Sequence, residues 1–217
     1  MIKRLLFGPR SDGDPRPDAL ARILDAPPDA RPLRAVVCTA LPDLQAGPAH
    51  AVTVVEWLAD RAHLGRRAAW LAAEGPTPAP GVTVVVAEEH VRRGAAWLEA
   101  RWADGGPRLK HMAVARRGRG LTPAEFSERW RGRAGRVGAT PIPEVARGCA
   151  YAQNHPLARP EGDWRYDAVN EVWFDDEDAL RTRIAWLDEA VGRGDDDDLV
   201  REASFLAVRE ELLVTGR

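Results

Sequence analysis

The sequence predicts an α+β protein in which one strand, helix, strand, strand, helix, strand unit occurs twice and the two copies pack face to face. Internal repetition in a sequence decides the architecture. Three segments recur in the same order along the chain. Each first-half segment is given with its second-half counterpart: 2–7 with 109–114, 51–57 with 168–174, and 82–89 with 204–211.

Each pair of segments keeps a common mark. The first pair has lysine in second place, at Lys3 and Lys110, within the short apolar run of a β-strand. The second pair is followed by a helical stretch containing Ala-Trp-Leu, at 69–71 and again at 185–187. The third pair reads as a closing strand that ends in two adjacent glutamates. Three matches in order indicate a duplication whose unequal spacings are absorbed by loops.

Each copy also has room for a first helix and a second strand. In the first copy, helical spacing predicts a helix over 17–25, and a β-like run covers 33–40. In the second copy, Thr-Pro-Ala-Glu is a capping box that starts a helix over 122–130, and 148–155 supplies the strand. This is the ferredoxin-like order. Each sheet has one face without helices, so the two bare faces can close into a pseudo-dimeric α/β barrel.

The repeats divide the chain into three parts. Residues 1–90 form a divergent ferredoxin-like repeat, 91–107 a connector helix that ends at Gly-Gly-Pro, and 108–217 the repeat that carries the candidate site. The acidic run 195–198 lacks the spacing of a calcium loop and is expected to be solvated. Negative charge favours a helix N-terminus, so we expect a helix to start at Leu199.

Composition limits the classes of partner. The chain has 217 residues, 45% of them hydrophobic, which is enough for a large core. Its formal net charge of −2 argues against nucleic acid. The chain contains no run near the roughly 20 apolar residues that span a bilayer, and the N-terminal run is too short for a signal sequence. We therefore expect a cytoplasmic protein without membrane contact, either monomeric through its internal pseudo-dimer or a homodimer.

The second copy resembles the EthD family of dimeric α/β-barrel proteins. The resemblance covers about 108–213 and is carried by three ordered motifs, at 120–130, 151–155 and 166–175. Members usually have one ferredoxin-like unit per chain and pair two chains, so this chain resembles a fused version. The resemblance implies cofactor-independent chemistry, including decarboxylation, on hydrophobic aromatic or polyketide-derived molecules. Other members have only a genetic link to a degradation pathway.

One position departs from the family pattern. After the first-helix tryptophan, members usually carry a His-Gly pair, whereas this chain has Ala134 where that histidine is expected. If the histidine is the family's acid or base, this chain uses another residue or has lost the reaction.

Two residues are the candidates for proton transfer. His155 titrates near neutral pH, although a histidine before proline can also cap a loop. Glu171 lies among apolar neighbours, so it has either a raised pKa or an arginine partner, and the ion pair is the favoured interpretation. His111 is the weakest candidate, because a lone histidine in an apolar strand is usually structural. The three could converge on the interior of the barrel.

Substrate contacts are expected from polar and aromatic residues of the same strands. Side-chain alternation places Tyr151, Gln153 and His155 on one face of their strand, and Glu171 and Trp173 on one face of the next. Aromatic residues at alternate positions are also typical of a core. The predicted substrate-binding set is Tyr151, Gln153, Asn154, Asn170, Trp173 and His111.

The sequence thus predicts a cofactor-independent lyase, cyclase or isomerase that acts on a hydrophobic aromatic or polyketide-like molecule. We expect neither a cofactor nor a metal, since the histidines lack metal-ligand spacing, although a single histidine leaves haem open. The alternative is a non-catalytic ligand-binding or accessory protein, and a cofactor-free monooxygenase is a third hypothesis.

Overall fold

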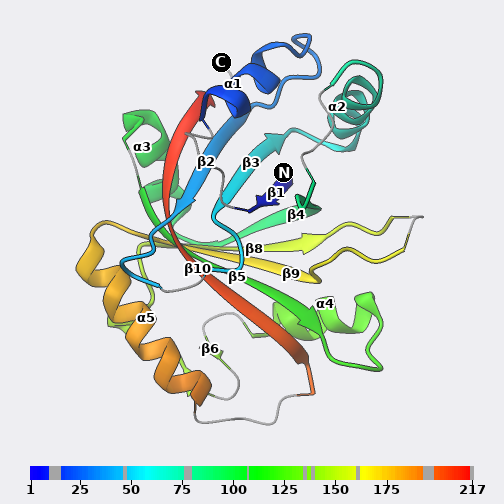
Figure 1. Cartoon of the computed structure of the whole chain (residues 1–217). Helices are drawn as coiled ribbons and strands as arrows, with labels where there is room; N and C mark the ends of the chain where they lie inside the picture. Colours follow the sequence, from blue (N-terminus) through cyan, green and yellow to red (C-terminus); the bar gives the residue numbers. More distant parts are fainter. Residues whose placement is uncertain are drawn as a thin grey trace.

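Eight antiparallel strands close into a barrel, and the helices lie outside it (Figure 1). The structure is a computed structural model that describes residues 1–9, 16–45, 48–75, 80–106, 108–133, 136–137, 140–159, 162–192 and 198–215. None of the helices among these residues is long and apolar enough to cross a membrane.

Each half of the chain supplies four neighbouring strands of the barrel, and the two halves meet at two seams, β2–β10 and β4–β8. Around the barrel the order is β1-β3-β2-β10-β5-β9-β8-β4, so β4-β1-β3-β2 and β10-β5-β9-β8 form two adjacent arcs. Each neighbouring pair is antiparallel. The strands are β1 (Ile2–Gly8), β2 (Arg34–Ala40), β3 (Val52–Leu58), β4 (Thr83–Arg93), β5 (Arg108–Arg117), β8 (Ala150–Pro156), β9 (Ala168–Phe174) and β10 (Val200–Thr215).

The remaining elements are few and lie between the strands in sequence. Helices α1 and α2 accompany the first-half strands, α3 connects β4 to β5, and α4 and α5 accompany the second-half strands (Figure 1). Two short strands pair only with each other. The elements are α1 (Arg16–Leu24), α2 (Arg61–Ala73), α3 (Ala95–Asp104), α4 (Pro123–Arg131), α5 (Glu177–Gly192), the 3-10 turn η1 (Glu144–Ala146), β6 (Arg136–Val137) and β7 (Thr140–Pro141).

The start of α4 forms as its sequence predicts. The Thr122 side chain accepts a hydrogen bond from the backbone N–H of Glu125, and the Glu125 carboxylate accepts one from the backbone N–H of Thr122 at 2.8 Å. This capping box satisfies donors that a helix N-terminus otherwise leaves unpaired. Pro123 occupies the first turn, where its missing N–H costs nothing. The cap fixes where α4 leaves the sheet.

The helix expected from Leu199 does not form. Strand β10 begins at Val200 instead, and the backbone carbonyl of Leu199 accepts a hydrogen bond from the N–H of Gly118 at 2.6 Å. The Leu199 side chain is fully buried in a cluster with Phe126. Burial of this leucine beside β5 outweighs the preference of nearby aspartates for a helix start.

The two halves place their marker residues in the same register. Lys3 lies opposite Trp57 in the β1–β3 pair, and Lys110 lies opposite Trp173 in the β5–β9 pair. All four side chains are buried inside the barrel. The main hydrophobic cluster also draws on both halves, so the barrel has one shared core.

Candidate functional site

The predicted site residues divide between the two faces of the second-half strands. Successive strand residues point to opposite sides, here either to the barrel interior or to the outer face beneath α4 and α5. Glu171 lies opposite Met112 in the β5–β9 pair, whereas His111 lies opposite Val172. The convergence of Glu171 with His111 and His155 is therefore wrong. Interior residues are Asn154, Glu171 and Trp173, and outer-face residues are His111, Tyr151, Gln153, His155 and Asn170.

The barrel interior contains an ionic network that spans both halves. Lys3 contacts Glu171 and lies 2.7 Å from Glu89, while Lys110 lies 2.8 Å from Glu171 and 2.6 Å from Glu210. Glu171 thus bridges the two lysines, one from each half. Both ammonium groups are fully buried, and such charges are tolerated only when they are paired.

Glu171 is held in its ionised form. Burial alone raises the pKa of its carboxyl, but Lys110 and Lys3 outweigh burial and lower the pKa to about 2. Asn154 adds a hydrogen bond to the same carboxylate at 2.9 Å. The partners are lysines rather than the expected arginine, because the recurring lysine of each half points inward. These three partners account for the burial of the charged carboxylate.

Trp173 belongs to the same network. Its indole N–H lies 3.3 Å from a Glu210 oxygen, and the first-half Trp57 donates to Glu89 at 3.0 Å. The ammonium of Lys110 lies 5.3 Å from the centroid of the Trp173 ring. Trp173 is fully buried among core residues, so its ring packs inside the barrel.

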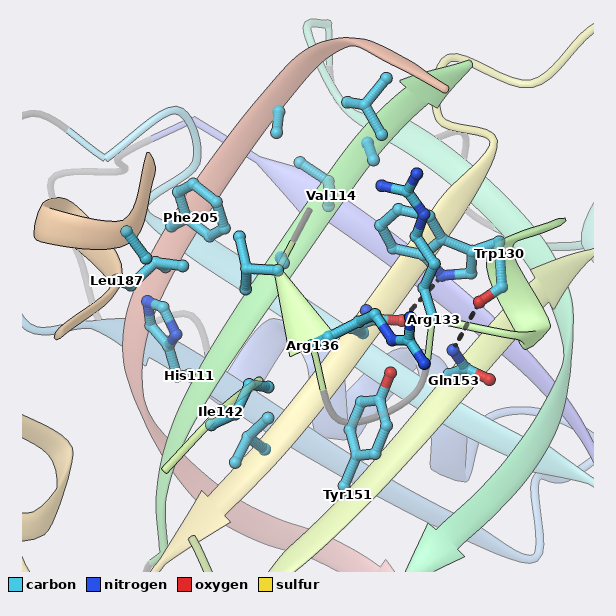
Figure 2. A pocket seen from close by; sticks show the side chains of 18 of the residues that line it. His111, Val114, Trp130, Arg133, Arg136, Ile142, Tyr151, Gln153, Leu187 and Phe205 are labelled. Carbon is cyan, nitrogen blue, oxygen red and sulfur yellow. Dashed lines mark hydrogen bonds between the residues drawn. The ribbon is translucent and has the colours of Figure 1, made fainter. Parts of the chain in front are cut away.

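A pocket of about 460 Å³ opens on the outer face of the second half. Its floor is formed by β5, β8, β9 and β10, and its walls come from α4, α5 and the segment around β6 and β7. Figure 2 shows Trp130, Gln153 and Tyr151 on one side and His111, Leu187 and Phe205 on the other. A volume of this size, with apolar walls and a few polar groups, is typical of small-molecule sites.

Four of the predicted substrate-binding residues supply polar groups to this pocket: Tyr151, Gln153, Asn170 and His111. The Asn170 side-chain oxygen accepts a hydrogen bond from the Trp130 indole at 3.2 Å, and Gln153 donates to the Trp130 carbonyl at 3.1 Å. These bonds hold the end of α4 against the sheet. The side-chain oxygen of Gln153 has no hydrogen-bond partner among the described residues. Burial raises the pKa of the Tyr151 hydroxyl to about 12, so it remains a proton donor at neutral pH.

His111 lies on the pocket floor as a neutral ring. Burial and then the positive charge of Arg183 lower its pKa to about 3. The imidazole stacks on Phe205 with the ring centroids 5.7 Å apart, and its Nε2 has no hydrogen-bond partner in the described part of the chain. His111 can therefore exchange hydrogen bonds with a ligand, but it is a weak base at neutral pH.

His155 lies on the same face of β8 as Tyr151 but outside the pocket lining. Its Nδ1 is 3.0 Å from the Ser127 hydroxyl of α4, and its ring lies edge to face with His90 at 5.0 Å between centroids. Burial, followed by Arg131, lowers its pKa to about 4. The ring is therefore neutral near pH 7, and its catalytic role stays a prediction.

Arginines dominate the charged lining of the pocket and were not predicted. Six arginines line it, against one carboxylate among the described lining residues, Glu202, which lies 3.5 Å from Arg116 and 3.6 Å from Arg165. One arginine, Arg183 of α5, is buried with 7% of its surface exposed. The sequence does contain a signal, since Arg183 interrupts an apolar stripe at helical spacing between Leu180 and Leu187. The six are Arg93, Arg133, Arg136, Arg147, Arg183 and Arg201.

Ala134, where the EthD-family histidine is expected, lies outside the described residues. Within the described part of the chain, no three His, Cys, Asp or Glu side chains gather in a way that could hold a metal ion.

Comparison with known proteins gives a likeness of shape only. No family model matches the sequence, and no curated protein matches it. The chain is similar to a solved structure of a proposed monooxygenase from Fusobacterium nucleatum, with 7% identity, a TM-score of 0.46 and coverage of 98% of this chain and 92% of that one. For a proposed monooxygenase from Lactobacillus acidophilus the values are 10%, 0.43, 99% and 96%. Values this low identify neither a family nor an activity.

Proposed function

We propose that the protein binds a hydrophobic, aromatic or polyketide-like small molecule in the outer pocket and converts it without a cofactor, as a lyase, cyclase or isomerase. The observation that carries the proposal is the pocket of about 460 Å³ with apolar walls and the polar side chains of Tyr151, Gln153 and Asn170. A ligand seated there would be enclosed on several sides, with a few groups to orient its oxygens.

The arrangement of strands bears on the origin of the chain. The arcs β4-β1-β3-β2 and β10-β5-β9-β8 have the same internal order, as expected for two ferredoxin-like repeats fused in one chain. We infer from this and from the three second-half motifs that the chain is a fused relative of the EthD proteins. The pocket lies on the half that carries those motifs.

The polar side chains of the pocket would have two different roles. Tyr151 keeps its proton at neutral pH because its pKa is about 12, so it can donate a hydrogen bond to an oxygen that gains negative charge during enolisation. Asn170 and Gln153 keep the Trp130 ring in place as an aromatic wall. A water molecule in the pocket would accept the proton from the substrate's acidic carbon and return a proton to the carbon or oxygen where the product requires it.

The test is turnover of a panel of aromatic keto acids and linear polyketide mimics, followed by mass spectrometry and oxygen uptake. Tyr151→Phe should lower kcat by about a hundredfold to a thousandfold, because removal of a single oxyanion donor has that effect in other enzymes. Glu128→Gln, an exposed change on α4 outside the pocket lining, is the matched control. Normal turnover by Tyr151→Phe would contradict the role given to Tyr151, and oxygen uptake coupled to substrate would assign oxygenation instead.

A second candidate function, non-catalytic binding, is favoured by one observation. The only imidazole among the described lining residues is His111, and its pKa of about 3 makes it a weak base. In that case ligands of the panel bind, as seen by quenching of Trp130 fluorescence, but none is converted. Trp130→Phe identifies which part of the signal comes from the pocket, since the chain has eight tryptophans.

A further inference from the structure

The first half has an ion cluster on its outer face, at positions that correspond to the pocket of the second half. Glu56 of β3 lies 2.5 Å from Arg67 of α2 and 3.2 Å from Arg4 of β1. Arg67 also donates from its Nε to the same carboxylate at 3.4 Å. Glu56 and Arg67 are almost fully buried, with 3% and 1% exposure. One carboxylate thus neutralises an arginine that reaches down from the helix.

The corresponding strand positions of the second half hold no carboxylate. In the first half, the strand pair next to Lys3 and Trp57 is Arg4 opposite Glu56. In the second half, the strand pair next to Lys110 and Trp173 is His111 opposite Val172. Val172 therefore stands where the first half has Glu56. Both Val172 and His111 line the pocket.

The helix positions correspond as well. Arg67 precedes Trp70 by three residues, and its guanidinium lies 4.9 Å from the centroid of that ring. Arg183 precedes Trp186 by three residues and lies 5.2 Å from its ring centroid. Each half thus has an arginine at the corresponding helix position, close to the ring of the tryptophan three residues later.

Arg183 lacks the partner that its counterpart has. It is 93% buried, since 7% is exposed, and no carboxylate of the described residues forms an ion pair with it. Its Nε has no hydrogen-bond partner there, and its Nη1 donates only a long bond of 3.4 Å to the carbonyl of Ala146. A buried guanidinium without a counter-ion is costly, so a ligand that brings one is strongly favoured.

We propose that the molecule bound in the pocket carries a carboxylate, which pairs with Arg183 in the place that Glu56 occupies in the first half. This inference rests on the proposed function, since it names the chemical class of the same pocket's ligand. The guanidinium edge that includes Nε is free to form the paired hydrogen bonds by which arginine recognises a carboxylate. His111 adds a ring nitrogen at the same spot.

The proposed contact also bears on the reaction. A carboxylate held by a fixed cation is stabilised in the ground state, and decarboxylation would move its charge away from that cation. The carboxylate bound at Arg183 is therefore a handle, and it is retained in the product. This favours isomerisation or cyclisation elsewhere in the ligand over loss of this group as CO2.

The first experiment compares a matched pair of probes, 2-naphthoate and 2-naphthamide, by calorimetry with the whole chain. We expect naphthoate to bind at least about tenfold more tightly than naphthamide, because a charged hydrogen-bonded pair contributes more than 1.4 kcal/mol. Arg183→Met should abolish that preference. Arg181→Gln, an exposed change on the solvent side of the same helix, should retain it. Equal binding of the two probes would overturn the carboxylate site while leaving the small-molecule pocket intact; binding of neither would overturn both.

A second pair of variants tests the site by thermal stability as well as by naphthoate binding. Val172→Glu rebuilds the first-half arrangement, and Val172→Gln has similar size without charge. We expect the glutamate variant to unfold at a higher temperature than the glutamine variant and to lose naphthoate binding, because its own carboxylate occupies Arg183. A glutamate variant that is the less stable of the two would show that Arg183 does not lack a counter-ion.

Discussion

At the scale of single residues, corresponding arginines of the two halves differ in role because only one of them has a glutamate partner on the sheet. Arg67 and Arg183 both extend from the second helix of their half and both stack on a tryptophan. Arg67 forms an ion pair with Glu56, whereas Arg183 lines a pocket together with Val172, the residue at the strand position that corresponds to Glu56. The sequence shows that an arginine interrupts the apolar stripe of α5, but it does not show whether a carboxylate reaches that arginine from the sheet.

The ionisation of His111 should report the charge of Arg183. Because Arg183 lowers the pKa of His111, Arg183→Met should raise that pKa above its value of about 3. The pKa should remain below 6.5, since burial is the larger cause of the shift. Titration of the histidine Cε1 proton by NMR measures the change, and Arg181→Gln should leave it unaltered. The same value in Arg183→Met and wild type would contradict the proximity of the two groups.

At the scale of strands, the periodicity of the sequence identified which residues share a face but not which face is interior. Tyr151, Gln153 and His155 do share a face, and Glu171 and Trp173 share the opposite side of the sheet. Both faces are buried in the second half, one by the barrel and the other by helices. Apolar residues therefore occur at alternating and non-alternating positions alike, and the inner face could not be chosen from hydrophobicity.

The inward face of β9 gives a prediction that separates a structural from a catalytic role for Glu171. Glu171→Gln removes one of two carboxylate partners from each buried ammonium group and leaves Lys3 with Glu89 and Lys110 with Glu210, so it should lower the free energy of unfolding by about 1–3 kcal/mol. Urea unfolding followed by circular dichroism measures the loss. A folded variant should retain ligand binding in the outer pocket, because Glu171 is not among its lining residues. Normal stability combined with lost turnover would instead support the catalytic role predicted from the sequence.

At the scale of the whole molecule, the sequence predicted a barrel from repetition and bare sheet faces, and a closed barrel of eight strands is what the structure has. The pocket could not be predicted in the same way. Its walls come from α4, α5 and residues near β6, which are distant in sequence and meet only after the barrel closes. The resemblance of residues 151–155 to a known motif directed attention to His155, but the histidine on the pocket floor is His111.

The buried histidines should make the molecule less stable in mild acid. His111 and His155 have folded-state pKa values lowered to about 3 and about 4, against 6.5 for the free side chain. The unfolded chain therefore binds more protons between these values, so stability is complete above about pH 6.5 and falls as the pH is lowered toward 4. Below pH 4.5 the lowered pKa of Glu171 adds to the loss. Thermal unfolding from pH 7.5 to 4 measures this, and His155→Gln should reduce the slope; a slope equal to that of wild type would contradict it.

The bridging carboxylate of the barrel interior also determines which polypeptides could assemble if the gene were cut in front of β5. Each seam of the barrel joins one strand of either half, so the two fragments would have to find each other. Two C-terminal fragments would bring two copies of Glu171 and Glu210 against two of Lys110, and two N-terminal fragments would place Val55 where Glu171 belongs. Only the mixed pair places one Glu171 carboxylate between Lys3 and Lys110, so this bridge favours complementation between unlike fragments.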